Sequence, residues 1–214
     1  MKAMILAAGR GERMRPLTDT LPKPLLVARG RPLIEHHLDA LVRAGITDVV
    51  INLGWLGERL RDHVGDGRRY GLTVAYSEEG YPPLDTGGGI QHALGLLGPA
   101  PFWVLNGDVF CDFPVRIREL AADALAHLVL VRNPPQHPAG DFALANGLVN
   151  NSASERHTYS GFAIVDPRLL AASTPGRFPL APLLRDAAAR GAVTGELHEG
   201  AWSDVGTPER LAAL

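Results

Sequence analysis

Near its amino terminus the chain reads Leu6-Ala7-Ala8-Gly9-Arg10-Gly11-Glu12-Arg13-Met14-Arg15-Pro16-Leu17. This segment continues the short apolar run Ala3–Ala7, which has the length and composition of a buried β-strand. Glycines here let backbone N–H groups approach an anion closely, and a concave run of such groups favours phosphate. Because ligands bind at the carboxyl ends of strands in open α/β sheets, the sequence predicts a strand followed by a phosphate-binding loop.

Outward from this loop, apolar runs alternate with amphipathic helical patterns. Strands are predicted at Ala3–Ala7, Thr47–Leu53, Leu72–Tyr76, Phe102–Leu105 and His127–Val131, with further strand-like pieces at Phe142–Val149 and Thr158–Val165. Helices are predicted at Pro32–Ala44, Leu56–Val64, Gly88–Leu97, Leu180–Arg190 and Pro208–Leu214. This alternation predicts an α/β fold in which a mostly parallel central sheet is flanked by helices on both faces. We expect residues 1–214 to form a single domain.

Composition narrows the class of protein. The 214 residues are 46% hydrophobic and 21% charged, which excludes a disordered chain. No apolar run reaches the roughly 18 residues that a membrane span needs, and the net charge of −2 gives no support to nucleic-acid binding. A single cysteine, Cys111, excludes an internal disulfide framework. We therefore expect a cytoplasmic enzyme without membrane or nucleic-acid partners, as a monomer or weak homo-oligomer.

The choice of basic residues draws attention to one position. Of the 21 basic residues only Lys2 and Lys23 are lysines, and all others are arginines. Arginine is a planar fork, whereas lysine is a compact point charge on a flexible stem. Lys23 stands between Pro22 and Pro24, so we expect its ammonium group to have a chemical role.

Two common nucleotide-binding motifs do not match the loop. A dinucleotide fingerprint needs a third small residue that opens a helix, but position 14 is Met and Pro16 interrupts the helix. A Walker loop needs Gly-Lys-Ser/Thr, which is absent. The glycines alone could form a simple turn; the cations Arg13, Arg15 and Lys23 beside them favour phosphate binding.

The run Leu6–Thr18, followed by Pro22-Lys23-Pro24-Leu25, resembles the signature of sugar-1-phosphate nucleotidyltransferases. The resemblance implies a Rossmann-like fold and a reaction that joins a nucleoside triphosphate to a sugar 1-phosphate and releases pyrophosphate. Two positions depart from the wider pattern: Glu12 replaces a common Thr, and Ala8 a common Gly. The sequence Gly-Glu-Arg is associated with the branch that acts on N-acetylmuramate 1-phosphate, which implies UTP as the donor.

The resemblance also implies the residues of the site. Arg13, Lys23 and Asp108 would be catalytic, and Asp108 with Asp204 would hold Mg²⁺. A lone aspartate at a strand end is usually a turn former, and spacing alone does not pair these two. Asp204 could instead cap a helix, although Thr207 before Pro208 suits that role better. The implied nucleotide-binding residues are Ala7, Ala8, Gly9, Gly11, Glu12, Arg13, Lys23, Gly87, Gly88 and Asn106, with Glu12 acting through its backbone only.

The residues that would contact the base and the sugar are predicted from weaker patterns. The glycines of Asp85-Thr86-Gly87-Gly88-Gly89 would let a flat base lie against main chain, or could simply be a helix entry with Thr86 as N-cap. Sugar contacts are implied at Asn106, Asp141, Asn150 and Gly161. Asp141 could also be a simple turn residue. For a carboxylate on the sugar, Arg156 or His157 would supply the cation.

The resemblance therefore implies uridylyl transfer from UTP to N-acetylmuramate 1-phosphate, in the recycling of peptidoglycan precursors. Alternatives are the same chemistry on another hexose 1-phosphate, with GTP and mannose 1-phosphate or with dTTP or UTP and glucose 1-phosphate. A non-catalytic sugar-nucleotide sensor is a further alternative. The acceptor phosphate is mostly dianionic at neutral pH, because its second pKa is about 6, so no general base is expected.

Overall fold

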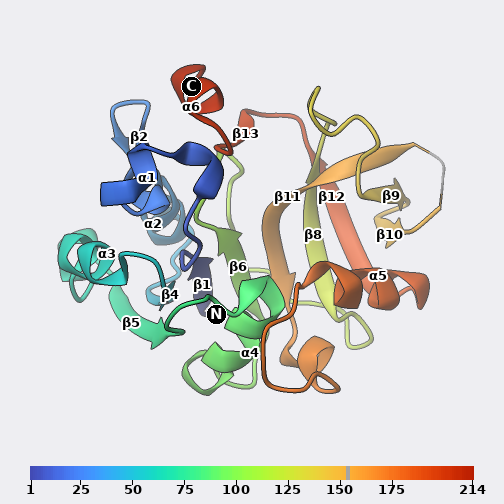
Figure 1. Cartoon of the computed structure of the whole chain (residues 1–214). Helices are drawn as coiled ribbons and strands as arrows, with labels where there is room; N and C mark the ends of the chain where they lie inside the picture. Colours follow the sequence, from blue (N-terminus) through green and yellow to red (C-terminus); the bar gives the residue numbers. More distant parts are fainter. Residues whose placement is uncertain (153–154) are drawn as a thin grey trace.

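A nine-stranded sheet with the order β5-β4-β1-β6-β11-β8-β12-β10-β9 runs through the molecule (Figure 1). The computed structural model describes residues 1–152 and 155–214. One half of the sheet is parallel and consists of β1 (Ala3–Leu6), β4 (Asp48–Leu53), β5 (Thr73–Glu78) and β6 (Phe102–Asn106). These strands follow the predicted apolar runs, and each is joined to the next by a segment that contains a helix.

The other half of the sheet corrects the prediction of a mostly parallel sheet. The long strand β11 (Arg156–Val165) lies between β6 and β8 (Ala126–Val131) and is antiparallel to both. The hairpin of β9 (Phe142–Ala145) and β10 (Leu148–Asn150) also pairs antiparallel, and β9 pairs with the start of β11. Only β12 (Val193–His198) runs parallel to its neighbour β8 here. The α/β class is confirmed, but the sheet is mixed. The hairpin of β9 and β10 is antiparallel because a short connection joins only antiparallel strands.

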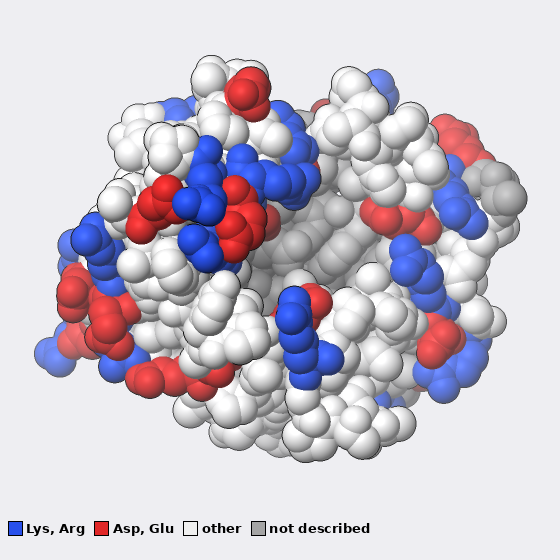
Figure 2. Space-filling view, viewed as in Figure 1, with Lys and Arg blue, Asp and Glu red and all other residues white. Residues whose placement is uncertain are grey.

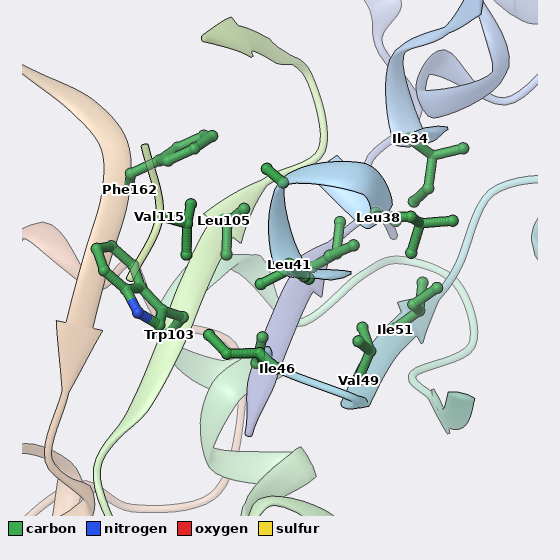
Figure 3. Packing of buried hydrophobic residues seen from close by; sticks show 14 of the residues in the cluster. Ile34, Leu38, Leu41, Ile46, Val49, Ile51, Trp103, Leu105, Val115 and Phe162 are labelled. Carbon is green, nitrogen blue, oxygen red and sulfur yellow. The ribbon is translucent and has the colours of Figure 1, made fainter. Parts of the chain in front are cut away.

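Helices cover both faces of the sheet, as predicted. On one face lie α2 (Leu33–Arg43) and α3 (Gly57–Val64); Ile34, Leu38 and Leu41 of α2 pack over Val49, Ile51 and Leu105 (Figure 3). On the other face, α4 (Asp85–Leu97) and α5 (Ala181–Ala189) bury Ile90 and Leu184 with Met4, Val104 and Leu128. The apolar stripe of each helix thus forms part of the core.

Shorter elements frame the carboxyl end of the parallel strands. These are η1 (Glu12–Met14), α1 (Leu17–Thr20), η2 (Lys23–Leu25), the hairpin β2 (Val27–Ala28) and β3 (Arg31–Pro32), and the antiparallel pair β7 (Val109–Cys111) and β13 (Trp202–Asp204). Elsewhere lie η3 (Arg68–Tyr70), η4 (Pro167–Leu170) and α6 (Pro208–Ala212). Within the described residues, none of the helices has the length and apolar character to cross a membrane.

A buried histidine in α2 makes stability depend on pH. His37 is 1% exposed and packs against Phe162; its burial lowers the pKa of its imidazole to about 4, from the ordinary value of 6.5. As the pH falls from 6.5 towards 4, the His37 imidazole is therefore protonated in the unfolded chain but stays neutral in the folded chain. We expect the free energy of unfolding to fall by up to about 2 kcal/mol between about pH 7.5 and about pH 5 from this group.

The measurement is thermal unfolding at the two pH values for the wild type, for His37→Leu and for His92→Gln. The leucine variant removes the titrating group and should lose less stability on acidification. His92 is exposed, so its variant should follow the wild type. An unchanged pH dependence in His37→Leu would show that other groups govern acid stability.

Candidate active site

A cleft of about 420 Å³ opens at the carboxyl ends of β1 and β6. Figure 2 shows this face hollowed at its centre, with basic and acidic side chains gathered along part of its rim. The walls come from the predicted phosphate loop, η2, the start of α4 and the segments after β6 and β13. The lining residues are Leu6, Ala7, Ala8, Gly9, Gly11, Glu12, Arg13, Lys23, Pro24, Asn52, Glu79, Pro83, Asp85, Thr86, Asn106, Asp108, Arg177 and Gly206.

The phosphate loop is held in shape by the two parts of the sequence motif. Gly11 has a left-handed φ of 66°, and a Cβ there would lie 3.2 Å from Cδ of Lys23 and 3.3 Å from Cγ2 of Thr18. The Thr18 hydroxyl donates to the Gly11 carbonyl at 2.9 Å. Gly9, by contrast, has no atom within 4 Å of the Cβ position. The loop is therefore supported beneath Gly11 and open above Gly9, where an anion could approach.

The charge of Glu12 is balanced within the loop itself. Its carboxylate pairs with Arg10, whose Nε lies 3.3 Å from Oε1, and the Arg10 guanidinium lies over the Trp55 ring at 4.3 Å. This pairing reduces the repulsion that an acidic residue beside a triphosphate would otherwise cause. It is compatible with the predicted backbone-only role of Glu12.

Lys23 and Asp108 form the ion pair at the centre of the cleft. The Nζ atom of Lys23 lies 2.7 Å from Oδ2 of Asp108, and the lysine side chain is only 9% exposed. Asp108 is more open, with 46% of its side chain exposed. η2 brings Lys23 to the carboxyl ends of β1 and β6. Two of the three predicted catalytic residues are thus in direct contact.

The second predicted metal ligand lies close to the first along a strand pair. β13 pairs with β7 so that Asp204 is opposite Val109, and the Val205 N–H donates to the Asp108 carbonyl at 2.9 Å. The Asp204 carboxylate accepts hydrogen bonds from Arg210 of α6 and, at 2.8 Å, from Gln136. Its side chain does not line the cleft, but Gly206 just beyond it does.

The two carboxylates have the oxygen-donor chemistry that a divalent cation shared with a substrate would need. Each is paired with a basic side chain, Lys23 or Arg210, which a bound cation would have to replace. In residues 1–152 and 155–214, no group of three or more His, Cys, Asp or Glu gathers as a complete cage. Mg²⁺ is typically bound by one or two carboxylates together with substrate phosphates and water. Asp108 and Asp204 therefore remain the predicted metal ligands.

The glycines at the start of α4 have a packing reason. A Cβ at Gly88 would lie 2.2 Å from the Gly176 carbonyl oxygen, and one at Gly87 would lie 2.5 Å from the Phe178 ring. Neither glycine lines the cleft, whereas Thr86 does. The alternative role of Thr86 as N-cap is wrong, because α4 begins at Asp85 and the Thr86 hydroxyl accepts from the Leu180 N–H at 2.8 Å. Contact of Gly87 and Gly88 with a base stays a prediction.

The predicted sugar residues are only partly brought together. Gly161, with φ 87°, packs on Asn106, since a Cβ there would lie 2.8 Å from the Asn106 amide nitrogen. Asp141 accepts from the Tyr159 N–H at 2.9 Å and contacts His137 at 3.1 Å. Asn150, at the end of β10, accepts from the Ser152 N–H at 3.0 Å. Of these residues only Asn106 lines the cleft, and contact of all four with a sugar stays a prediction.

Asn52 and Arg177 line the cleft but were not predicted as site residues. The Asn52 amide donates to Glu79 at 2.6 Å, and Glu79 accepts from the Leu84 N–H at 2.8 Å, so this pair fixes the wall between β4 and α4. Arg177 reaches the cleft from the segment before α5. Asn52 stands near the end of the predicted strand Thr47–Leu53, which is a signal that could have found it. No local pattern marks Arg177.

A glycine-rich loop beside a lysine–aspartate pair, at the carboxyl edge of an α/β sheet, is the arrangement expected of an enzyme that transfers phosphate-containing groups. The chain belongs to the nucleotidyl transferase family, whose sequence profile matches residues 2–152. It is 48% identical to the N-acetylmuramate alpha-1-phosphate uridylyltransferase of Neisseria meningitidis, over 99% of this chain and 95% of that protein. The protein of the same name from Caulobacter vibrioides is 38% identical, over 99% of this chain and 94% of that protein.

More distant relatives share the chemistry or the fold. A mannose-1-phosphate guanyltransferase beta-A of Xenopus laevis is 30% identical over 98% of this chain and 62% of that protein. A putative glucose-1-phosphate thymidylyltransferase from Bacillus anthracis, solved with sucrose, superimposes with a TM-score of 0.86, covering 100% of this chain and 93% of that one. At 22% identity it supports the fold alone. The chain is therefore a sugar-1-phosphate nucleotidyltransferase, and enzymes of this family generally use a divalent metal ion.

Proposed function

We propose that the enzyme transfers a uridylyl group from UTP to N-acetylmuramate 1-phosphate, giving UDP-N-acetylmuramate and pyrophosphate. The observation that carries this proposal is the 48% identity, along almost the whole chain, to a protein named for that reaction. The cleft adds the chemical groups that the reaction needs, namely Arg13, Lys23 and Asp108 around one cavity. We further propose a cytoplasmic enzyme of peptidoglycan precursor recycling.

The transfer needs positioning and charge rather than a base. An oxygen of the acceptor phosphate attacks the α-phosphorus of UTP; the bond to the bridging oxygen breaks, and pyrophosphate leaves with the electron pair. Since the acceptor phosphate is already mostly dianionic at neutral pH, no proton has to be removed. The difficulty is that two anions must meet and that negative charge grows on the leaving group.

The cations of the cleft suit these two tasks. The buried stem of Lys23 fixes its ammonium group at one point of the cleft, where it would contact the α-phosphate. Arg13 lines the cleft beside Gly206 and would bind the leaving pyrophosphate. We propose that Asp108 and Asp204 hold Mg²⁺, which when bound supplies positive charge to the phosphate oxygens. With Mg²⁺ bound, Lys23 would leave Asp108 and Arg210 would leave Asp204, and both basic groups would be free to contact other anions such as the phosphates of the substrates.

Activity on another hexose 1-phosphate is the second candidate, because the mannose-1-phosphate guanyltransferase of Xenopus laevis also covers nearly all of this chain. An assay of pyrophosphate release with Mg²⁺, run with four nucleoside triphosphates and several sugar 1-phosphates, distinguishes this candidate from the muramate-specific reaction. We expect kcat/KM for UTP with N-acetylmuramate 1-phosphate to exceed that of every other pair at least about tenfold, a difference of about 1.4 kcal/mol. Preference for GTP with mannose 1-phosphate would contradict the proposal. Tight binding of sugar nucleotides without turnover of any pair would favour a sensor.

A further inference from the structure

The segment between η4 and α5 places one arginine at the edge of the cleft. Its backbone is fastened to the start of α4: the Phe178 N–H donates to the Leu84 carbonyl at 3.1 Å, and the Gly88 N–H donates to the Phe178 carbonyl at 3.0 Å. The Leu180 N–H donates to the Thr86 hydroxyl at 2.8 Å. Arg177 directly precedes this anchored stretch and lines the cleft. Its backbone position is therefore fixed although its side chain is exposed.

The guanidinium of Arg177 has no hydrogen bond or ion pair with any other residue in the described part of the chain. The acidic groups that line the cleft, and Lys23, each have a hydrogen-bond or ion-pair partner within the chain. Asp85, on the same wall, accepts from the Thr86 N–H at 2.7 Å, and Glu79 is bound by Asn52 and the Leu84 N–H. Lys23 pairs with Asp108 on the opposite side. An unpaired cation on a fixed segment of a substrate cleft is suited to bind an anion of the substrate.

In the proposed reaction the phosphates would have partners elsewhere. Arg13 and Lys23 stand on the wall formed by the phosphate loop and η2, where the bond between the two substrates would form. Arg177 stands on the wall shared with Pro83, Asp85 and Thr86. The nucleobase predicted to lie near the glycines after Thr86 carries no negative charge. An anion at Arg177 is therefore best supplied by a part of the acceptor that does not react.

We propose that Arg177 binds a carboxylate carried by the acceptor sugar, and so selects an acidic hexosamine 1-phosphate over its neutral counterpart. This inference rests on the proposed function, in which the carboxylate is that of the lactyl group of N-acetylmuramate. The planar fork of arginine binds a carboxylate through two parallel hydrogen bonds.

The cations that the sequence offered for this carboxylate are less suitable. Arg156 donates from Nε to the Ser152 carbonyl at 2.8 Å and from a terminal nitrogen to the Asn151 carbonyl at 2.9 Å. Neither Arg156 nor His157 lines the cleft. Two of the donors of Arg156 are thus occupied by backbone carbonyls within the protein.

The test compares two acceptors that differ only in the lactyl group, N-acetylmuramate 1-phosphate and N-acetylglucosamine 1-phosphate, each with saturating UTP. Arg177→Gln should raise KM for the acidic acceptor about 10- to 100-fold, the effect of losing a hydrogen-bonded charge. It should leave kcat/KM for the neutral acceptor unchanged. Calorimetric binding of UDP-N-acetylmuramate and UDP-N-acetylglucosamine should show the same difference, and supplies the comparison where turnover of the neutral acceptor is too slow to measure.

The matched control is Arg190→Gln, which removes an exposed arginine at the far end of α5 and should behave as the wild type. Thermal unfolding of both variants verifies that the fold is intact. Equal losses of kcat/KM on both acceptors would show that Arg177 binds their common phosphate. A rise in KM for UTP alone would show that it binds the nucleotide. Either result overturns the inference, as does an Arg177→Gln variant that behaves as the wild type. If the wild type turned over neutral hexose 1-phosphates and rejected N-acetylmuramate 1-phosphate, the proposed function itself would fail.

Discussion

Lys23→Arg should lower kcat at least about 100-fold although it keeps the positive charge, a loss comparable to that of deleting one preorganised electrostatic group. The lysine side chain is 9% exposed, and its methylenes fill the space beside Gly11, where a Cβ would lie only 3.2 Å from its Cδ. Its Nζ reaches Asp108 as a single point of charge at 2.7 Å. The wider guanidinium of an arginine would not fit in this space beside Gly11 without moving the phosphate loop. Lys23→Ala should lose at least as much.

The measurement is pyrophosphate release under saturating substrates, with thermal unfolding to show that each variant is folded. Lys2→Arg is the matched control, because it exchanges the only other lysine of the sequence, whose Nζ bonds the Leu96 carbonyl at the surface. It should retain wild-type activity. A Lys23→Arg enzyme that turned over normally would show that any cation suffices here, and that the scarcity of lysine carries no chemical meaning.

Local patterns predicted the loop after β1 and the longer helices well. Gly11, Thr18 and Lys23 lie within a short stretch of chain, and in the structure they pack against one another, so neighbours in sequence determine the shape of the loop. The helix predicted at Pro32–Ala44 is α2, Leu33–Arg43, because an apolar stripe facing one core is visible in the sequence itself.

Features that depend on distant segments could not be predicted in this way. Strand β12 was missed, because Gly195 interrupts its apolar pattern; the glycine is required since a Cβ there would lie 2.6 Å from Val149 of the neighbouring β10. The proximity of Asp108 and Asp204 depends on the pairing of β7 with β13, which only the family resemblance suggested. Arg177 is likewise placed by contacts between its segment and α4, which no local spacing encodes.

Asp108→Asn should also lower kcat at least about 100-fold, and for a different physical reason. The amide keeps the shape of the side chain but removes its negative charge. The variant thus leaves the Lys23 ammonium, buried on a 9% exposed side chain, without its carboxylate partner. It also removes one of the two carboxylates that would hold Mg²⁺, a hard cation that prefers charged oxygen ligands. We therefore expect weaker binding of Mn²⁺, used as a paramagnetic substitute for Mg²⁺, in addition to the loss of turnover.

The comparison with Asp204→Asn and with the double variant shows whether the two carboxylates act on one ion. If they do, removing either should abolish most of the metal binding, so the double variant should be little worse than either single variant, because effects at groups that act as a unit are not additive. Mn²⁺ binding by electron paramagnetic resonance measures this independently of turnover. Asp112→Asn is the control, since that carboxylate bonds His198 at 2.7 Å outside the cleft and should leave both quantities unchanged. Fully additive losses, or metal binding that survives in the double variant, would contradict a shared metal ion. Asp204 would then have a purely structural role as the partner of Arg210 and Gln136, and Asp108 would act mainly by pairing with Lys23.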